Sequence, residues 1–476
     1  MKAIINCFCF IVVGALCLCS GNIQAETLQD AVHHVIQTSP EIRAIAYNRL
    51  ARDQEVIQAR AGFLPSIDAS FSIGYEKETE PSSDDTWPDQ YVLGLRQNVF
   101  RGFGTLNEVK RQKARVKSSA YLLQGNSESS ALSVSRVYLN VLRQLEIHEL
   151  AKENLTIHER IHDQIKLRSE SGLDRKADLD QVEGRLALAQ SNMVVTEANV
   201  VDAETDYLKV VGLFPEDLVK PQPVDSALPD SLAEAQQLAI KEQPILKSAD
   251  ADLEAREAQH VVAKSSFSPT LDIAVDQKWD NDVDEPGYVE ELQAIAMVRF
   301  NIFNGFSDKA RAAETLELIN EAREIRHNTY RQTVEFTRLA WVSHKASIDQ
   351  IKYLENYVES ISGTASAFQK QWNIGRRTMF DVLDIEAEVI NAKRDLVNAR
   401  YDKIISQYRI LTGMGKLVHT LGLEWPAESQ VEKKAEQAPK QTEEAPKQSS
   451  HEKGAPAGEK SASLEVSPLD RRLNSF

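Results

Sequence analysis

Beyond residue 25 the sequence lacks cysteine, because all four cysteines of the 476-residue chain lie between Cys7 and Cys19. Without a thiol, the rest of the chain can form no disulfide and offers no thiolate ligand or cysteine nucleophile, which excludes several enzyme classes. Eighteen consecutive apolar residues, the least that a membrane-spanning helix needs, do not occur after Leu18. Clustered positive charge is also scarce: the net charge is −16, which argues against a nucleic-acid partner.

The first 25 residues have the features of a secretory signal. Lys2 supplies a positive start, residues 4–18 form an apolar core, and Ala25 offers a small residue for cleavage. We therefore expect residues 1–25 to be a signal peptide and the remainder of the chain to be exported.

The rest of the chain contains an internal sequence duplication. Residues 63–68 (FLPSID) recur 204 positions later as residues 267–272 (FSPTLD), and residues 99–103 (VFRGF) recur 203 positions later as residues 302–306 (IFNGF). A single one-residue gap keeps the two halves in register for about 180 residues, which chance similarity does not do. The chain is thus two copies of one structural module.

Each copy contains two segments in which every second residue is apolar. In the first copy Ile67, Ala69, Phe71, Ile73 and Tyr75 alternate with mostly polar residues. Such alternation over about ten residues is typical of a membrane β-barrel strand, although a half-buried strand of a soluble sheet shows it too. Long acidic loops at 76–90 and 281–288 favour the barrel. Four strands cannot close a membrane barrel of at least about eight, so we expect the chain to oligomerise, and three copies would supply twelve.

Long helical hairpins follow the strands. No proline occurs over 104–171 or 305–373, which predicts helices of roughly 100 Å at about 1.5 Å per residue. The returning segments carry apolar residues at alternating spacings of three and four, the pattern of a coiled-coil seam. We interpret this stripe as packing.

These patterns predict a chain divided as follows: 1–25, signal peptide; 26–212, first repeat, with strands near 64–75 and 90–100 and a helical hairpin near 104–212; 213–230, inter-repeat segment; 231–423, second repeat, with strands near 270–280 and 289–303 and a hairpin near 305–412; 424–476, disordered polar tail.

The hairpin ends carry a recurring motif. Gly172 and Asp178 in the first half match Gly375 and Asp381 in the second, and the following helix includes the stretch NAKRDLVNARY at 391–401. A glycine followed six residues later by an aspartate, ahead of such a helix, closely resembles the TolC family of outer-membrane export ducts. The resemblance covers residues 26–423 in order.

The resemblance implies a mixed fold, a membrane β-barrel of twelve strands continued by a coiled-coil barrel of twelve helices, built by a homotrimer. It implies acidic rings at a periplasmic gate, formed by Asp381 and Asp384, which lie three residues apart on one helix face. It also implies a latch made by Trp372, Arg377 and Asp178. The hairpin residues expected to contact a periplasmic adaptor are Gly172, Leu173, Gly375 and Arg376.

The same resemblance implies an exit duct in the outer membrane, with its helical tunnel in the periplasm. The expected partners are a periplasmic adaptor, outer-membrane lipid and an inner-membrane pump, either an ABC transporter of type I protein secretion or a proton-driven pump. We favour protein secretion, with multidrug or small-molecule efflux as the alternative. A secreted coiled-coil scaffold or adhesin is a more distant alternative, because it explains neither the paired strands nor their duplication. We expect no enzyme activity, cofactor or nucleic-acid partner.

One motif points elsewhere. His158, Glu159 and His162 match the H-E-x-x-H pattern, in which two helical histidines bind zinc and the glutamate acts as a base. The match falls within the long first-half helix, with no clear third ligand. We therefore interpret it as a chance match and expect no metal site.

Overall fold

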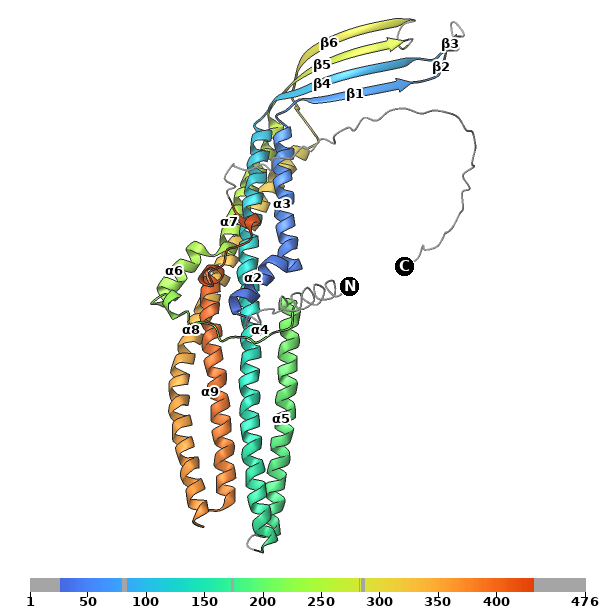
Figure 1. Cartoon of the computed structure of the whole chain (residues 1–476). Coiled ribbons are helices and arrows are strands. Elements are labelled where there is room, and N and C mark those ends of the chain that lie inside the picture. The colour runs from blue at the N-terminus through green and yellow to red at the C-terminus, as the bar shows by residue number, and fades with distance from the viewer. Residues whose placement is uncertain (1–25, 79–83, 173–174, 282, 284–286, 432–476) are drawn as a thin grey trace, which may run out of the picture. The chain divides into compact units, whose positions relative to one another are not determined.

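The computed structural model describes residues 26–78, 84–172, 175–281, 283 and 287–431 (Figure 1). Two units are distinguished, and the described residues belong to the first, which ends at Val431. The predicted signal peptide lies outside the described residues, as do residues 432–476. The elements in chain order are α2 (Leu28–Thr38), α3 (Pro40–Ala61), β1 (Ser66–Ile73), β2 (Glu76–Glu78), β3 (Asp84–Thr86), β4 (Asp89–Arg101), α4 (Gly104–Glu170), α5 (Lys176–Val211), η1 (Asp225–Ala227), α6 (Leu232–Glu242), α7 (Pro244–Lys264), η2 (Ser265–Phe267), β5 (Thr270–Asn281), β6 (Tyr288–Arg299), α8 (Ser307–Asn373), α9 (Met379–Gly413), α10 (Leu417–Thr420) and η3 (Ala427–Ser429).

The duplication is visible in the order of the elements. Each half has two short helices, then a pair of long strands, then a helical hairpin whose first helix, α4 or α8, has 67 residues. Pro40 and Pro244 begin α3 and α7, where a missing N–H costs no helical hydrogen bond. In each hairpin the two helices lie side by side, α4 with α5 and α8 with α9 (Figure 1).

The four long strands form one antiparallel sheet in the order β1-β4-β5-β6. β1 begins at Ser66 rather than near 64, because Pro65 has no N–H to donate to a sheet. β6 ends at Arg299, short of the expected 303. The segment at 76–90, expected to be a loop, contains the short strand pair β2-β3 and the start of β4. The expected number of strands is corrected accordingly. Beside the pair, the rings of Tyr75 and Trp87 lie 5.2 Å apart.

The register places most of the large apolar residues of the strands on one face of the sheet. Leu95 pairs with Ile67 on one side and with Val275 on the other, and Val275 pairs with Ala294. Because side chains alternate between faces along a strand, this face also includes the apolar residues Ala69, Phe71, Ile73, Tyr91, Leu93, Leu271, Ile273, Trp279, Leu292, Ala296 and Val298. Polar members of the same face are Gln97, Gln277 and Glu290. All residues of β1 and β6 are exposed within one chain. An extended apolar face is thus left uncovered by the described part of the chain.

Strand and helix join without a loop after β4, and a matching turn precedes α8. Gly102 and Phe103 both have positive φ, 54° and 61°, and Gly305 and Phe306 repeat this at 56° and 65°. The aromatic rings on either side of each turn pack edge to face, Phe100 on Phe103 at 5.5 Å. In Gly102, a Cβ atom would lie 2.5 Å from Ser268, so the glycine is needed for close approach as well as for its backbone angle.

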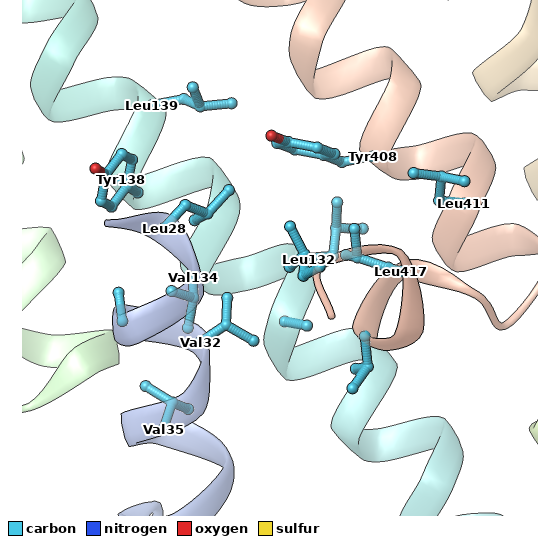
Figure 2. Close-up of a cluster of buried hydrophobic side chains, with 14 of the residues drawn as sticks. Leu28, Val32, Val35, Leu132, Val134, Tyr138, Leu139, Tyr408, Leu411 and Leu417 are labelled. Atoms are coloured by element: carbon cyan, nitrogen blue, oxygen red, sulfur yellow. The ribbon is translucent and has the colours of Figure 1, made fainter. Parts of the chain in front are cut away.

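The main hydrophobic core lies where α2, α9 and α10 pack on the middle of α4 (Figure 2). Leu28 and Val32 of α2 face Val134 and Tyr138 of α4, and all four side chains are buried. Fully burying side chains of this size contributes about 1.5–3 kcal/mol each. This core fixes the point on α4 from which the hairpin extends.

A buried carboxylate holds the segment after α9 on the same core. Glu128 of α4 accepts hydrogen bonds from the backbone N–H groups of Leu417, at 2.8 Å, and Val418, at 3.3 Å, and from Nε1 of Trp425 at 3.0 Å. Burial raises the pKa of this carboxyl to about 7, against the lowering effect of the three hydrogen bonds.

The expected polar tail therefore begins later than residue 424. Gln124 of α4 donates to the carbonyl of Ser429 at 2.9 Å, and this segment contains η3. The composition of 424–431 resembles a tail, but the Trp425 ring and these backbone hydrogen bonds attach it to α4. Within the described residues, no helix combines the length and apolar character required to cross a membrane.

Candidate functional site

The ends of the two hairpins have matching turns. Gly172 follows α4 with φ of 77°, and Gly375 follows α8 with φ of 73°, a backbone conformation that glycine adopts without strain. The N–H of Gly375 donates to the carbonyl of Trp372, and the N–H of Arg376 donates to the carbonyl of Gln371, both at 2.9 Å. Leu173, expected to contact an adaptor, lies outside the described residues.

Asp178 and Asp381 occupy equivalent places, in the first turn of the returning helix. Oδ2 of Asp381 accepts from the Thr378 hydroxyl at 2.8 Å and from its N–H at 3.2 Å, and the hydroxyl accepts in turn from the Asp381 N–H. Hydrogen bonds from the Thr378 hydroxyl and N–H, with a smaller effect of Arg377, lower the pKa of Asp381. Among the described residues, Asp178 accepts from the N–H of Arg175, at 3.3 Å.

This capping box is a role that the sequence-based hypothesis missed. Thr378 and Asp381 show the signature, a hydroxyl residue followed three positions later by an acidic one at the start of a helix. The capping hydrogen bonds use only Oδ2 of Asp381. The other oxygen, Oδ1, lies 3.6 Å from Nη1 of Arg377. The gate role of Asp381 stays a prediction.

Asp384 links the two hairpins. Its Oδ1 lies 2.6 Å from Nη2 of Arg185, which belongs to α5. Arg185 is not among the residues predicted from the sequence. Arg185 lies seven residues, about two helical turns, after Asp178. Its pairing with Asp384 depends on how the two hairpins align with each other, which the sequence does not indicate.

Arg377 makes its contacts within the second hairpin. Its Nε donates to Oε1 of Gln371 at 3.1 Å, and its guanidinium lies 3.8 Å from the centre of the Phe368 ring. Among the described residues, no hydrogen bond or ion pair joins Arg377 to Asp178. The latch between these two side chains therefore stays a prediction.

The predicted latch residues nevertheless line one cleft. Trp372, Arg377 and Asp178 border a space of about 500 Å³ between the hairpins. Beneath it the two hairpins share a small apolar cluster, in which the buried members are Ile161, Ile165, Val182, Met379, Val382 and Leu383. The Trp372 ring packs against this cluster and lies 5.8 Å from the guanidinium of Arg168. In the segments that the structure describes, the hairpin ends are thus joined by apolar packing, by the contact of Arg168 with the Trp372 ring and by the Arg185–Asp384 ion pair.

The H-E-x-x-H match sits higher on α4, with its two histidines in different surroundings. His158 is 5% exposed and its Nδ1 lies 2.9 Å from the carbonyl of Asn154. His162 is nearer the surface, with Nδ1 3.3 Å from Asp163. Over the residues that the structure describes, no group of three or more metal-binding side chains converges.

Comparison with known proteins identifies the class of this fold. The family model described as outer membrane efflux protein matches residues 31–212 and 235–416, one match in each half. The chain therefore belongs to the outer membrane efflux protein family, and the resemblance to TolC proteins is confirmed.

The relatives include outer membrane efflux protein BepC of Brucella suis, 22% identical over 393 residues, covering 80% of this chain and 85% of BepC. Outer membrane protein TolC of Escherichia coli is 23% identical over 402 residues, 78% of each chain. Proteases secretion protein PrtF of Dickeya chrysanthemi is 23% identical over 409 residues, 79% of this chain and 86% of PrtF.

Solved structures show the same fold. The CmeC outer membrane channel of Campylobacter jejuni superposes with a TM-score of 0.75 at 14% identity, covering 83% of this chain and 87% of CmeC. The chain is thus an outer-membrane channel protein of the efflux family, and it is not an enzyme.

Proposed function

We propose that three copies of the chain form one exit duct, with a twelve-stranded barrel in the outer membrane and a twelve-helix tunnel in the periplasm. The observation that carries this proposal is the sheet. In the described part of the chain β1 and β6 are its edges, so each presents N–H and C=O groups that no strand pairs. Open edges and an apolar face on one sheet are tolerated in lipid only if the sheet closes with other copies.

We propose further that the hairpin ends form the gate. In a trimer, Asp381 and Asp384 would place six carboxylates around one axis, where like charges repel and attract cations. The cleft lined by Trp372, Arg377 and Asp178 is where a latch would hold the two hairpins together. An adaptor would contact the turns at Gly172, Leu173, Gly375 and Arg376.

For the cargo, we propose a protein exported by a type I system, in which an inner-membrane ABC transporter and a periplasmic adaptor deliver it to the duct. The similarity to PrtF, named as a proteases secretion protein, supports this choice. The similarity to BepC, named as an efflux protein, favours the second candidate, small-molecule efflux with an ABC transporter or a proton-driven pump.

Cross-linking tests the trimer. Ser70→Cys on β1 and Gln293→Cys on β6 place thiols on the two sheet edges of a chain that has none after residue 25. We expect a short bis-maleimide to convert the double variant into covalent trimers in isolated outer membranes. Each single variant is the control and should give no trimer. A double variant that yields only monomers, or a ladder without a limit at three, would contradict the proposal.

Deletion of the gene tests the cargo. For a protein-secretion duct, a specific protein should disappear from the culture medium while inhibitory concentrations of drugs stay unchanged. The reverse result would support small-molecule efflux and reject the type I assignment.

A further inference from the structure

A second polar cleft lies on the upper part of the helices, between α3, α4 and α7, far along α4 from the hairpin end. Its volume is about 300 Å³, the share of on the order of ten water molecules. Four of its lining residues are arginines in a chain of net charge −16. The lining is Arg52, Arg111, Arg115, Ser118, Ser119, Asp252, Ala255, Arg256 and Gln259.

Carboxylates position these arginines without neutralising all of them. Glu55 accepts from Arg52 at 2.6 Å with one oxygen and from Arg115 at 2.7 Å with the other. Glu108 accepts hydrogen bonds from both Nε and Nη2 of Arg111, at 2.8 and 2.6 Å. Asp252 lies 3.9 Å from Nε of Arg256. Four guanidinium groups therefore share three carboxylates, and the cluster keeps an excess of positive charge.

Arg115 experiences this excess most directly. Burial lowers its pKa most, and the charge of Arg52 lowers it further; Glu55 raises it by less than Arg52 lowers it, and Arg111 (lowering) and Glu108 (raising) have smaller effects. The same residue uses Nη1 for both Glu55 and Gln112. A negative group in the cleft would relieve the repulsion among the arginines.

The cleft is on the side of α4 away from the attached segment 424–431. Arg115 precedes Gln124, which donates to Ser429, by nine residues; nine residues are two and a half turns of helix, so the two side chains point in opposite directions. Lys117 precedes Gln124 by seven residues, close to two turns, and shares its face. Lys117, which pairs with Glu254 of α7 at 3.3 Å, thus lies on a different face of α4 from Arg115.

We propose that this cleft binds a phosphate-class oxyanion through Arg111 and Arg115, with Arg52 and Arg256 at its border. Guanidinium forks match the oxygens of phosphate in bidentate fashion, and the hydroxyl groups of Ser118 and Ser119 add donors. The phosphate can be free or part of a lipid headgroup, and both sources present the same oxygens. The site depends on one chain only and does not require the proposed duct.

Isothermal titration of the purified full chain tests the site. Inorganic phosphate is titrated into protein in a phosphate-free, lipid-free, low-salt neutral detergent, and dihexanoyl phosphatidylglycerol is titrated below its critical micelle concentration in a parallel arm. We expect saturable binding in at least one arm, and the arm that responds identifies the source. Arg115→Gln and Arg111→Gln should weaken it by roughly tenfold or more, because each removes a charge-assisted hydrogen-bond donor.

Two further variants separate binding from folding. Arg115→Lys keeps the charge beside Glu55 but not the fork, so it should fold and bind with intermediate affinity. Lys113→Gln removes one positive charge from α4 outside the cleft, and its affinity should match the wild type. Binding in neither arm, or binding that survives in both Gln variants, would overturn the proposal. So would equal weakening by Lys113→Gln, since this would show attraction to net charge alone.

Discussion

Nη2 of Arg185 lies 2.6 Å from Oδ1 of Asp384, and this ion pair ties α5 of the first hairpin to α9 of the second. The arginine side chain is 34% exposed and the aspartate 66%. Solvent screens such a pair, so its contribution to stability is about 1 kcal/mol or less. The ion pair matters because of its location: Arg185 neutralises Asp384, one of the two carboxylates expected at the gate.

Removing this arginine should favour an open duct. Arg185→Gln leaves Asp384 without its cross-hairpin partner, so the hairpins separate more easily and the carboxylate repulsion at the gate increases. We expect planar-bilayer conductance to rise by up to roughly fivefold, the equivalent of about 1 kcal/mol. Arg394→Gln, also exposed and on α9, is the matched control and should conduct as the wild type does. An unchanged conductance in Arg185→Gln would show that the ion pair does not hold the hairpins.

Neutralising the acidic residues should change ion selectivity. In Asp381→Asn/Asp384→Asn the proposed rings lose their charge, so we expect weaker cation preference and loss of block by divalent cations. Reversal potentials in a salt gradient measure the first and current inhibition by Mg²⁺ the second. Glu359→Gln, on the shaft of α8, is the control. Selectivity that equals the wild type in the double variant would exclude Asp381 and Asp384 from the narrowest part of the path.

Two glycines of the second hairpin should respond in opposite directions to alanine. Gly375→Ala forces a side chain into positive φ, at a cost of about 1–2 kcal/mol. Gly363→Ala lies within α8, where a Cβ atom meets nothing within 4 Å, so it should stabilise the helix by up to about 1 kcal/mol. Unfolding temperatures measured in one detergent compare both variants. A loss of stability in Gly363→Ala would mean that another surface covers this part of α8.

The buried Glu128 should make stability fall as pH rises. Its pKa is raised in the folded chain from 4.5 to about 7, so the folded state holds the proton more tightly than the unfolded state. The resulting stabilisation is complete below the unfolded value and is lost as pH rises through the folded one. We expect Glu128→Gln to flatten the decline in unfolding temperature over this window. Glu149→Gln, exposed on the same helix, should keep it; identical profiles in all three proteins would refute the assignment.

Much of the fold can be predicted from the sequence because its signals are local. Alternation from Ile67 to Ile73 defines a strand whichever strand lies beside it, and helices without internal proline are limited only by where turns occur. The recurrence of Gly172 and Asp178 as Gly375 and Asp381 locates both turns. In each case the information lies within a few residues of the structure that it specifies.

The relations between distant segments could not be predicted in this way. The Arg185–Asp384 pair depends on how two separate hairpins align, and the attachment of Trp425 to Glu128 joins residues 297 positions apart. Composition even misleads there, because the polar sequence after residue 424 resembles a tail. The capping role of Asp381 is different, because it can be predicted from the sequence. Thr378 and Asp381, three residues apart at the start of a helix, are the signature of a capping box.

The direct connection of β4 to α4 through Gly102 and Phe103 has a mechanical consequence. Because only two residues separate the sheet from α4, the first hairpin resembles a lever that is held at the sheet end. A lever of roughly 100 Å converts a rotation of a few degrees into a displacement of several ångströms at its free end. Widening at the hairpin turns would therefore require only slight bending along the helices, and the strands could stay at rest while it happens.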